Sequence, residues 1–261
     1  HKYNFLVNIA VGFLRAGNVD EADGTLDLVL DKAQIADCLV GFSQVFRGEG
    51  DSEEALESLE EAFAMLRSQT EREIRNTKVR LQLFGAVAKE FAELGKVERA
   101  LEIAHENPDS EVKNLTFSQI AQISTIQENN TMANSALNGI EPDPQRIPAI
   151  ISVSDVLLKL DRKDEARERL NEALEMTREI EQYIFRCELQ NQLARRFHEI
   201  GDTETSRSVL SDGLESAREI RGGAHRSVAL AELSETFAQL EFTLSAEDKE
   251  IIGTLVRTSD W

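Results

Sequence analysis

The stretch LLKLDRKDEARERLNEALEMTREI, residues 157–180, decides the fold, because it reads as the end of one helix, a tight turn and a second helix. A near repetition, RFHEIGDTETSRSVLSDGLESAREI, occupies residues 196–220. With Asp161 and Gly201 taken as the turn residues, the two stretches are 40 residues apart. A helical pair that recurs at such an interval indicates a repeat architecture.

Residues of the same kind recur at fixed distances from seven such turns. A small residue, such as Ala88 or Ala194, lies seven positions before each turn. An apolar residue lies eight positions before the turn, and the residue four positions before it is usually large. Offsets of three, four and seven mark one face of an α-helix, so the first helix of each pair is predicted to have one buried stripe. The turns are expected at Gly17, Gly50, Gly95, Glu128, Asp161, Gly201 and, in degenerate form, near Glu241.

The second helix of each pair continues the alternation of small and large residues. Alanine lies five positions after most turns, and leucine usually lies nine positions after them. Small residues facing large ones are what two packed antiparallel helices require, and each pair must stack on its neighbours to bury its apolar face. The sequence therefore predicts a single repeat domain over residues 1–261. Residues 245–261 would form a C-terminal capping helix and tail that begins with Ser245 and Asp248 at capping-box spacing.

Three runs match this pattern best: IAVGFLRAGNVDEADGTL at 9–26, VAKEFAELGKVERALEIA at 87–104 and LARRFHEIGDTETSRSVL at 193–210. The pattern resembles the tetratricopeptide repeat (TPR) over roughly residues 2–240. The resemblance implies an all-α, right-handed superhelical solenoid of about seven antiparallel helix pairs. The fourth pair departs most, with Ser124 where a large residue is expected, and all four prolines lie between residues 108 and 148. An irregular step is expected there. Val7 and Val11 are extra apolar residues on the first helix, expected to contact a further repeat upstream.

In the family that the chain resembles, the first helices line a concave groove where partners bind. Residues two, three, six and ten positions before each turn would face that groove. Several of them are basic in an otherwise acidic chain, which favours an acidic or carboxylate-bearing peptide as partner. The alternative is that they are ordinary solvated side chains. The candidate partner-binding residues are Arg47, Lys89, Gln122, Asp155, Lys159, Asn191, Arg195 and His198.

Composition limits the other classes of partner. The formal charge is −19, and phosphate binding needs clustered Lys and Arg, so nucleic acid and anionic membranes are disfavoured. No apolar run approaches the roughly 18 residues that a membrane span needs. The two cysteines, Cys38 and Cys187, are expected to be buried reduced thiols. That favours the cytoplasm, although the chain starts at His1 and the removal of a signal peptide would leave no trace.

Catalytic, cofactor and metal sites have no candidate residues in the sequence. The acids after each turn, such as Glu53 and Glu54, are read as complements to the helix dipole. The four histidines show no metal-ligand spacing, and no nucleophile elbow or HExxH motif occurs. We therefore expect a non-catalytic protein-interaction scaffold without a cofactor. Two alternatives stay open: self-assembly through the terminal repeats, and a regulatory arm of a larger protein.

Overall fold

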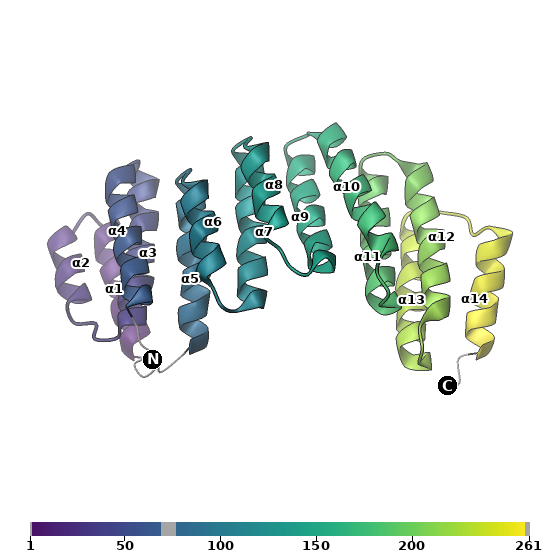
Figure 1. Ribbon diagram of the computed structural model, residues 1–261, viewed down its shortest axis with the longest axis horizontal. Coiled ribbons are helices and arrows are strands. Elements are labelled where there is room, and N and C mark those ends of the chain that lie inside the picture. The colour runs from purple at the N-terminus through teal and green to yellow at the C-terminus, as the bar shows by residue number, and fades with distance from the viewer. Residues whose placement is uncertain (1, 69–76, 259–261) are drawn as a thin grey trace. The chain divides into compact units, whose positions relative to one another are not determined.

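The fold is built entirely from helices in the part of the chain that the computed structural model describes, residues 2–68 and 77–258. Fourteen α-helices and one 3-10 helix occur there, and that part contains no strand. Consecutive α-helices form seven antiparallel pairs, as Figure 1 shows. The predicted all-α array of helix pairs is therefore confirmed. Packing divides the chain into two compact units, residues 1–140 and 141–261, and the boundary falls inside the segment that holds all four prolines.

The first unit contains four helix pairs, coloured purple to teal in Figure 1. Their first helices are neighbours, since α3 packs against both α1 and α5, and α5 packs against α7. The second helices α2, α6 and α8 are short, whereas α4 is long. The helices are α1 (Lys2–Arg15), α2 (Val19–Leu26), α3 (Lys32–Glu49), α4 (Ser52–Arg67), α5 (Thr77–Glu93), α6 (Val97–Glu106), α7 (Ser110–Ile126) and α8 (Asn130–Asn138).

The second unit contains three pairs, coloured teal to yellow in Figure 1. Here α11 packs against α9 and α13, and the last helix, α14, packs on α12 and α13. The elements are η1 (Asp143–Gln145), α9 (Arg146–Lys159), α10 (Lys163–Arg178), α11 (Tyr183–Glu199), α12 (Thr203–Glu219), α13 (Gly223–Gln239) and α14 (Ala246–Thr258).

All seven turns have the same backbone geometry. The turn residue is left-handed in each, whether it is a glycine such as Gly95 (φ 74°) or a larger residue such as Glu128 (φ 59°), Asp161 (φ 58°) or Glu241 (φ 57°). The next residue donates its N–H to the carbonyl four positions before the turn, at 2.8–2.9 Å in every case. This is the Schellman motif, which satisfies carbonyls that the end of a helix leaves open. A helix end with this bond sends the chain directly into the second helix.

The small residues of the repeat lie at the contact between the two helices of a pair. Ala88 and Ala194 are fully buried, and so are the partners that follow the turn, such as Ala100 and Ser206. Small side chains let the paired helices approach closely, and buried phenylalanines of the same helices, such as Phe91, fill the space beside them. The last pair differs, because Ser234 is exposed. There α14 begins five residues after the turn instead of two, and the pair packs in another way.

The first two pairs meet at a glycine. A Cβ added at Gly41 on α3 would lie 2.6 Å from Cγ2 of Val11 on α1. The missing side chain therefore lets α3 lie directly on Val11. Val7 is 7% exposed. Val11 thus has a partner, Gly41, within its own chain, and the expected contact with an upstream repeat stays a prediction.

Acidic and polar side chains cap several helices. Asp31, Asp51, Asp109 and Asp202 each accept a hydrogen bond from a backbone N–H two or three residues later. At α14 the predicted capping box is formed: Asp248 N–H donates to Ser245 Oγ at 3.0 Å, and Ser245 N–H donates to Asp248 Oδ2 at 2.8 Å. The acids at the helix starts are thus explained by local helix chemistry.

Candidate functional site

The eight candidate groove residues are divided between the two units. Arg47, Lys89 and Gln122 lie on α3, α5 and α7 of the first unit. The other five lie on α9 and α11 of the second unit. All eight are on first helices, as their spacing requires. Each unit therefore has its own set of candidate residues.

Arg47 joins two neighbouring first helices. Its Nε donates to Glu90 Oε1 at 2.6 Å and its Nη2 to Glu90 Oε2 at 3.4 Å, so α3 is tied to α5. The side chain of Glu90 is only 4% exposed, against 37% for Arg47. The hydrogen bond to Glu90 is the main reason why the pKa of Arg47 is raised. The positive charge of Arg47 is thus neutralised within the chain rather than free for a partner.

The second unit has an equivalent tie between α9 and α11. Asp155 accepts two hydrogen bonds from Arg196, from Nε at 3.0 Å and from Nη2 at 3.1 Å. Arg195, the next residue, reaches α13, where Nη1 donates to Gln239 Oε1 and Nη2 to Thr236 Oγ1, both at 2.6 Å. Asp155 and Arg195 therefore link neighbouring helix pairs. Because Thr236 and Gln239 are neutral, Arg195 keeps its net charge.

Gln122, Asn191 and His198 each lie in a different environment. Gln122 donates to the carbonyl of Ser118 on its own helix at 3.2 Å. Asn191 Oδ1 and His198 Nδ1 are buried without a hydrogen-bond partner in the described chain. The His198 ring meets Phe242 edge-on, with centroids 5.6 Å apart. These side chains are packed into the surface more than they project from it.

Lys89 and Lys159 are the candidate cations that stay accessible. Both are exposed, and neither forms an ion pair with any described residue. Lys159 lies in the last turn of α9, where a cation complements the helix dipole. Lys89 lies beside a hollow in the surface of the first unit.

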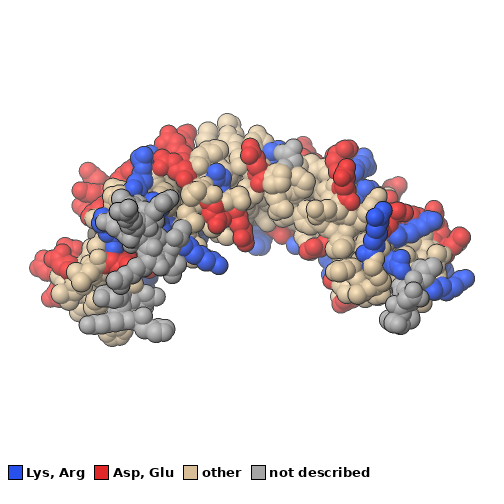
Figure 2. Space-filling model, turned by 60° about the horizontal axis from the view of Figure 1, so that its bottom comes forward, with Lys and Arg blue, Asp and Glu red and all other residues tan. Residues whose placement is uncertain are grey.

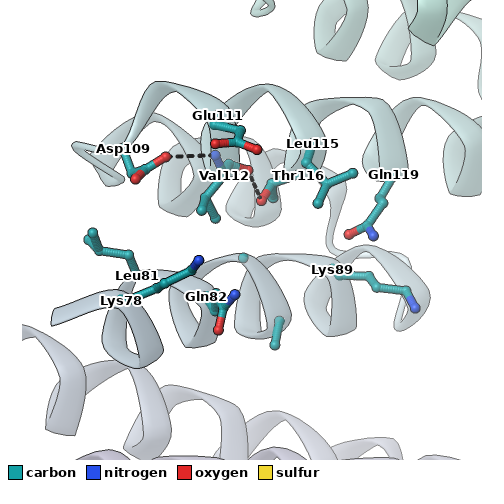
Figure 3. Close-up of a pocket in the computed structure, with 12 residues that line it drawn as sticks. Lys78, Leu81, Gln82, Lys89, Asp109, Glu111, Val112, Leu115, Thr116 and Gln119 are labelled. Atoms are coloured by element: carbon teal, nitrogen blue, oxygen red, sulfur yellow. Dashed lines mark hydrogen bonds between the residues drawn. The ribbon is translucent and has the colours of Figure 1, made fainter. Parts of the chain in front are cut away.

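That hollow, which we call the α5/α7 groove, has a volume of about 700 Å³. Figure 3 shows α5 and α7 running in the same direction, with Lys89 and Gln119 at one end and Lys78, Asp109 and Glu111 at the other. The groove is lined by Lys78, Leu81, Gln82, Gly85, Ala86 and Lys89 of α5, and by Asp109, Glu111, Val112, Leu115, Thr116 and Gln119 of α7.

The floor of the α5/α7 groove is apolar. A Cβ added at Gly85 would lie 2.7 Å from Thr116 Oγ1, so α5 and α7 lie close together there. The Thr116 hydroxyl donates to the Val112 carbonyl of its own helix at 2.7 Å and is thus satisfied locally. Leu115 is 59% exposed in the wall, which is unusual for a leucine inside a hollow. This arrangement can accept an apolar side chain from outside.

A second hollow, of about 380 Å³, lies between α10, α11 and α12 in the second unit. Its charged lining residues are two arginines, Arg178 and Arg186, and three acids, Asp212, Glu215 and Glu219. Burial raises the pKa of Asp212, and the two arginines oppose that shift. The charges largely balance, so this hollow shows no preference for a charged ligand.

On the face drawn in Figure 2, both acidic and basic side chains are present, separated by uncharged areas, and no continuous basic field covers that face. Within the described residues, no group of three or more His, Cys, Asp and Glu side chains could hold a metal ion. No described helix is long and apolar enough to cross a membrane. Both cysteines are free and buried.

Several residues that shape these surfaces were not among the sequence candidates. Glu90, Arg196, Thr236 and Gln239 complete the ties between pairs, and Leu115 is the exposed apolar centre of the α5/α7 groove. Arg196 and Glu90 both lie five positions before their turns, an offset not assigned to the groove. A search for opposite charges on neighbouring first helices would have found both ion pairs.

Comparisons with known proteins concern the fold. No protein-family model matches the sequence, and no curated protein matches it either. Among solved structures, the chain is similar to a tetratricopeptide repeat protein from Parabacteroides merdae, with 16% identity, a TM-score of 0.35, and 97% of this chain and 98% of that chain covered. It is also similar to a signal transduction ATPase of the STAND class with a tetratricopeptide repeat sensor from Pyrococcus horikoshii, at 12% identity and a TM-score of 0.34, covering 98% of this chain and 39% of that one. A circular tandem repeat protein matches at 16% identity and a TM-score of 0.36, with 98% and 63% covered. The helix pairs and Schellman turns described above show directly that the chain is a repeat of antiparallel helix pairs.

Proposed function

We propose that the chain is a non-catalytic scaffold that binds a peptide or protein segment along its first helices. The observation that carries the proposal is the α5/α7 groove, a hollow of about 700 Å³ with an apolar floor and an accessible lysine at its edge. Pockets that hold ligands combine an apolar lining with a few polar groups in this way. The helices on both sides are held by buried contacts, so the surface is formed before a partner arrives.

The direct test is selection of peptides against the folded chain. A randomised library of 12-residue peptides is displayed and selected on the immobilised protein, and the enriched peptides are measured in solution by fluorescence anisotropy. We expect saturable binding that weakens when Lys89→Glu reverses the accessible charge. Failure to enrich any peptide that binds in solution would reject the scaffold function.

A second function, self-assembly, is supported by apolar residues at the first helix pair. Phe5, Leu28 and Leu30 are 65%, 63% and 81% exposed. Exposed apolar side chains mark an association surface when they form one patch. Light scattering after size exclusion at several concentrations distinguishes the two functions, since a mass that stays that of one chain at all concentrations excludes self-assembly. A regulatory arm of a larger protein would use the same peptide-binding surface.

A further inference from the structure

The α5/α7 groove presents an uncovered apolar centre. Leu115 is 59% exposed, and Gly85, Ala86 and Val112 line the groove with it. Thr116, which also lines the groove, is 2% exposed, and its hydroxyl donates to the Val112 carbonyl of its own helix. An aliphatic side chain placed over Leu115 would remove apolar surface from water on both sides of the contact. The centre of the groove is therefore suited to one apolar side chain.

The two ends of the groove carry opposite charge. At one end Lys89 is the single charged group, and Gln119 lies opposite it (Figure 3). At the other end Asp109 and Glu111 outnumber Lys78. Asp109 accepts a hydrogen bond from Val112 N–H at 2.9 Å, whereas Lys78, Lys89 and Glu111 form no ion pair with any other described residue. One end is thus complementary to an acid and the other to a base.

The charge of the whole chain favours a ligand that carries both signs. At a formal charge of −19, the protein repels a strongly acidic peptide at long range. A segment with one acid and one base has no net charge and avoids this repulsion. It can still place its acid beside Lys89 and its base beside Glu111.

Helix geometry sets the spacing between these charges. Lys78 and Lys89 are 11 residues apart on α5, which is about 16 Å along the helix axis at 1.5 Å per residue. An extended peptide covers that distance in about five residues. Gly85 lies four residues before Lys89, about 6 Å along the axis, or about two residues of extended chain. The matching segment therefore carries an acid two residues from its apolar side chain and a base about three residues beyond it.

We propose that the α5/α7 groove binds an extended segment of a partner protein that carries an acidic residue, an aliphatic residue and a basic residue in this spacing. The aliphatic side chain covers Leu115, the acid pairs with Lys89, and the base lies at the opposite end, where Asp109 is six residues, or about 9 Å along the helix axis, from Leu115 and Glu111 is beside it. This inference rests on the proposed scaffold function and names the chemistry of its ligand.

The test uses four labelled peptides, acetylated and amidated at their ends, measured by fluorescence anisotropy with the full chain. GESLSSKG and its reversal GKSSLSEG present the spacing in both chain directions. GESSSSKG lacks the apolar residue, and GKSLSSKG lacks the acid. We expect one of the first two to bind at least ten times more tightly than either of the last two. Equal affinity for all four would overturn the proposal.

Protein variants locate the contact. Leu115→Glu and Lys89→Glu should each weaken binding at least tenfold, and Lys89→Glu should reverse the preference toward GKSLSSKG. The matched controls are Ile126→Glu, at a leucine-sized residue of α7 that is 57% exposed outside the groove, and Lys96→Glu, at an exposed lysine before α6. Both should stay within twofold of the unmodified chain. An equal loss with Ile126→Glu would show that the groove is not the contact.

A last pair of measurements separates this proposal from others. The same peptide with a free C-terminus should bind no better than the amidated form, and binding by the free form alone would mean that a terminal carboxylate is recognised instead. If library-selected peptides bind but ignore Leu115→Glu, the charge-patterned ligand is rejected while the scaffold function stands. If no peptide binds at all, both are rejected.

Discussion

Arg47 on α3 holds the buried carboxylate of Glu90 on α5 through two hydrogen bonds of 2.6 and 3.4 Å. The pair connects residues 43 positions apart in the sequence and lies on neighbouring helix pairs. The Glu90 side chain is only 4% exposed, so the Arg47 guanidinium takes the place of most of the water around its carboxylate. The contact between the second and third pairs is therefore polar at this point as well as apolar.

Replacing Arg47 should destabilise the first unit. Arg47→Ala leaves the charge of Glu90 buried without its partner, and we expect a loss of about 1–3 kcal/mol in the free energy of unfolding. The measurement is urea denaturation followed by circular dichroism. The matched control is Arg178→Ala, whose partner Glu175 is exposed, and which should cost less than about 1 kcal/mol. Arg47→Met combined with Glu90→Leu should recover most of the loss, and a double variant as unstable as Arg47→Ala would contradict this account.

Substitutions at the turn residues should change the free energy of unfolding in opposite directions. Glu128 and Asp161 hold left-handed backbone that glycine adopts without strain, so Glu128→Gly or Asp161→Gly should stabilise the chain by about 0.5–1 kcal/mol. Gly95→Ala and Gly201→Ala should destabilise it by about 1 kcal/mol, although a Cβ would meet no atom within 4 Å at either site. Thermal unfolding measures all four. A destabilised Glu128→Gly variant would show that the glutamate side chain contributes more than its backbone costs.

The contact between Gly41 and Val11 should appear as coupling between two substitutions. Gly41→Ala places a methyl group 2.6 Å from Val11 Cγ2, and valine on a helix has one strongly preferred rotamer, so we expect a loss of about 1–3 kcal/mol. In a Val11→Ala background the same change should cost less, or even stabilise, because alanine favours the helix over glycine by about 1 kcal/mol. Additive effects in the double-mutant cycle would contradict the close approach of α1 and α3.

The capping box of α14 should make the end of the chain sensitive to acid. Burial raises the pKa of Asp248, but hydrogen bonds from Ser245 and Ser211 and the charge of Arg207 outweigh that effect and lower it overall. A carboxyl whose folded-state pKa is depressed stabilises the fold above its unfolded pKa, about 3.9, and this contribution is lost as the pH falls through the folded value. Asp248→Asn should therefore destabilise α14 by about 1 kcal/mol at pH 7 and have less effect below pH 4. Hydrogen exchange of residues 246–257 measures this, and a loss independent of pH would contradict it.

The thiols should be inert in the folded chain. Burial raises the pKa of both Cys38 and Cys187 to about 12, helped by nearby acids, so almost no thiolate exists at pH 8. Iodoacetamide at pH 8 should modify neither residue within the time in which it modifies both in 6 M urea. Mass spectrometry of the alkylated chain provides the measurement. Rapid modification of either native thiol would show that its helix opens locally.

Much of the fold could be predicted because it depends on local spacing. The buried alanines Ala88 and Ala194 were predicted from helical periodicity, and the turns at Glu128 and Asp161 from the same offsets, although neither residue is a glycine. The helical period and the left-handed turn act over a few residues, so one sequence contains enough information to place them. The contact of Val11 with Gly41 was not predicted, because the two residues are 30 positions apart in the sequence.

The candidate site depended on contacts between pairs and was less accessible to prediction. Arg47 and Asp155 were proposed as partner-binding residues, but each faces an opposite charge on the next first helix. The α5/α7 groove depends on how closely Gly85 approaches Thr116. These features are set by the lateral placement of neighbouring helices, which the repeat spacing alone does not contain.

The Schellman bond at each turn uses only main-chain atoms. Asn129 N–H donates to the Ser124 carbonyl at 2.8 Å, as the residues after the other turns do to phenylalanine or leucine carbonyls. Ser124 shows that the side chain at this position can lose its bulk while the helix still ends at the same place. Successive helix pairs of such an array are therefore free to diverge in sequence and length. Related arrays can lose their sequence similarity while the path of the backbone is retained.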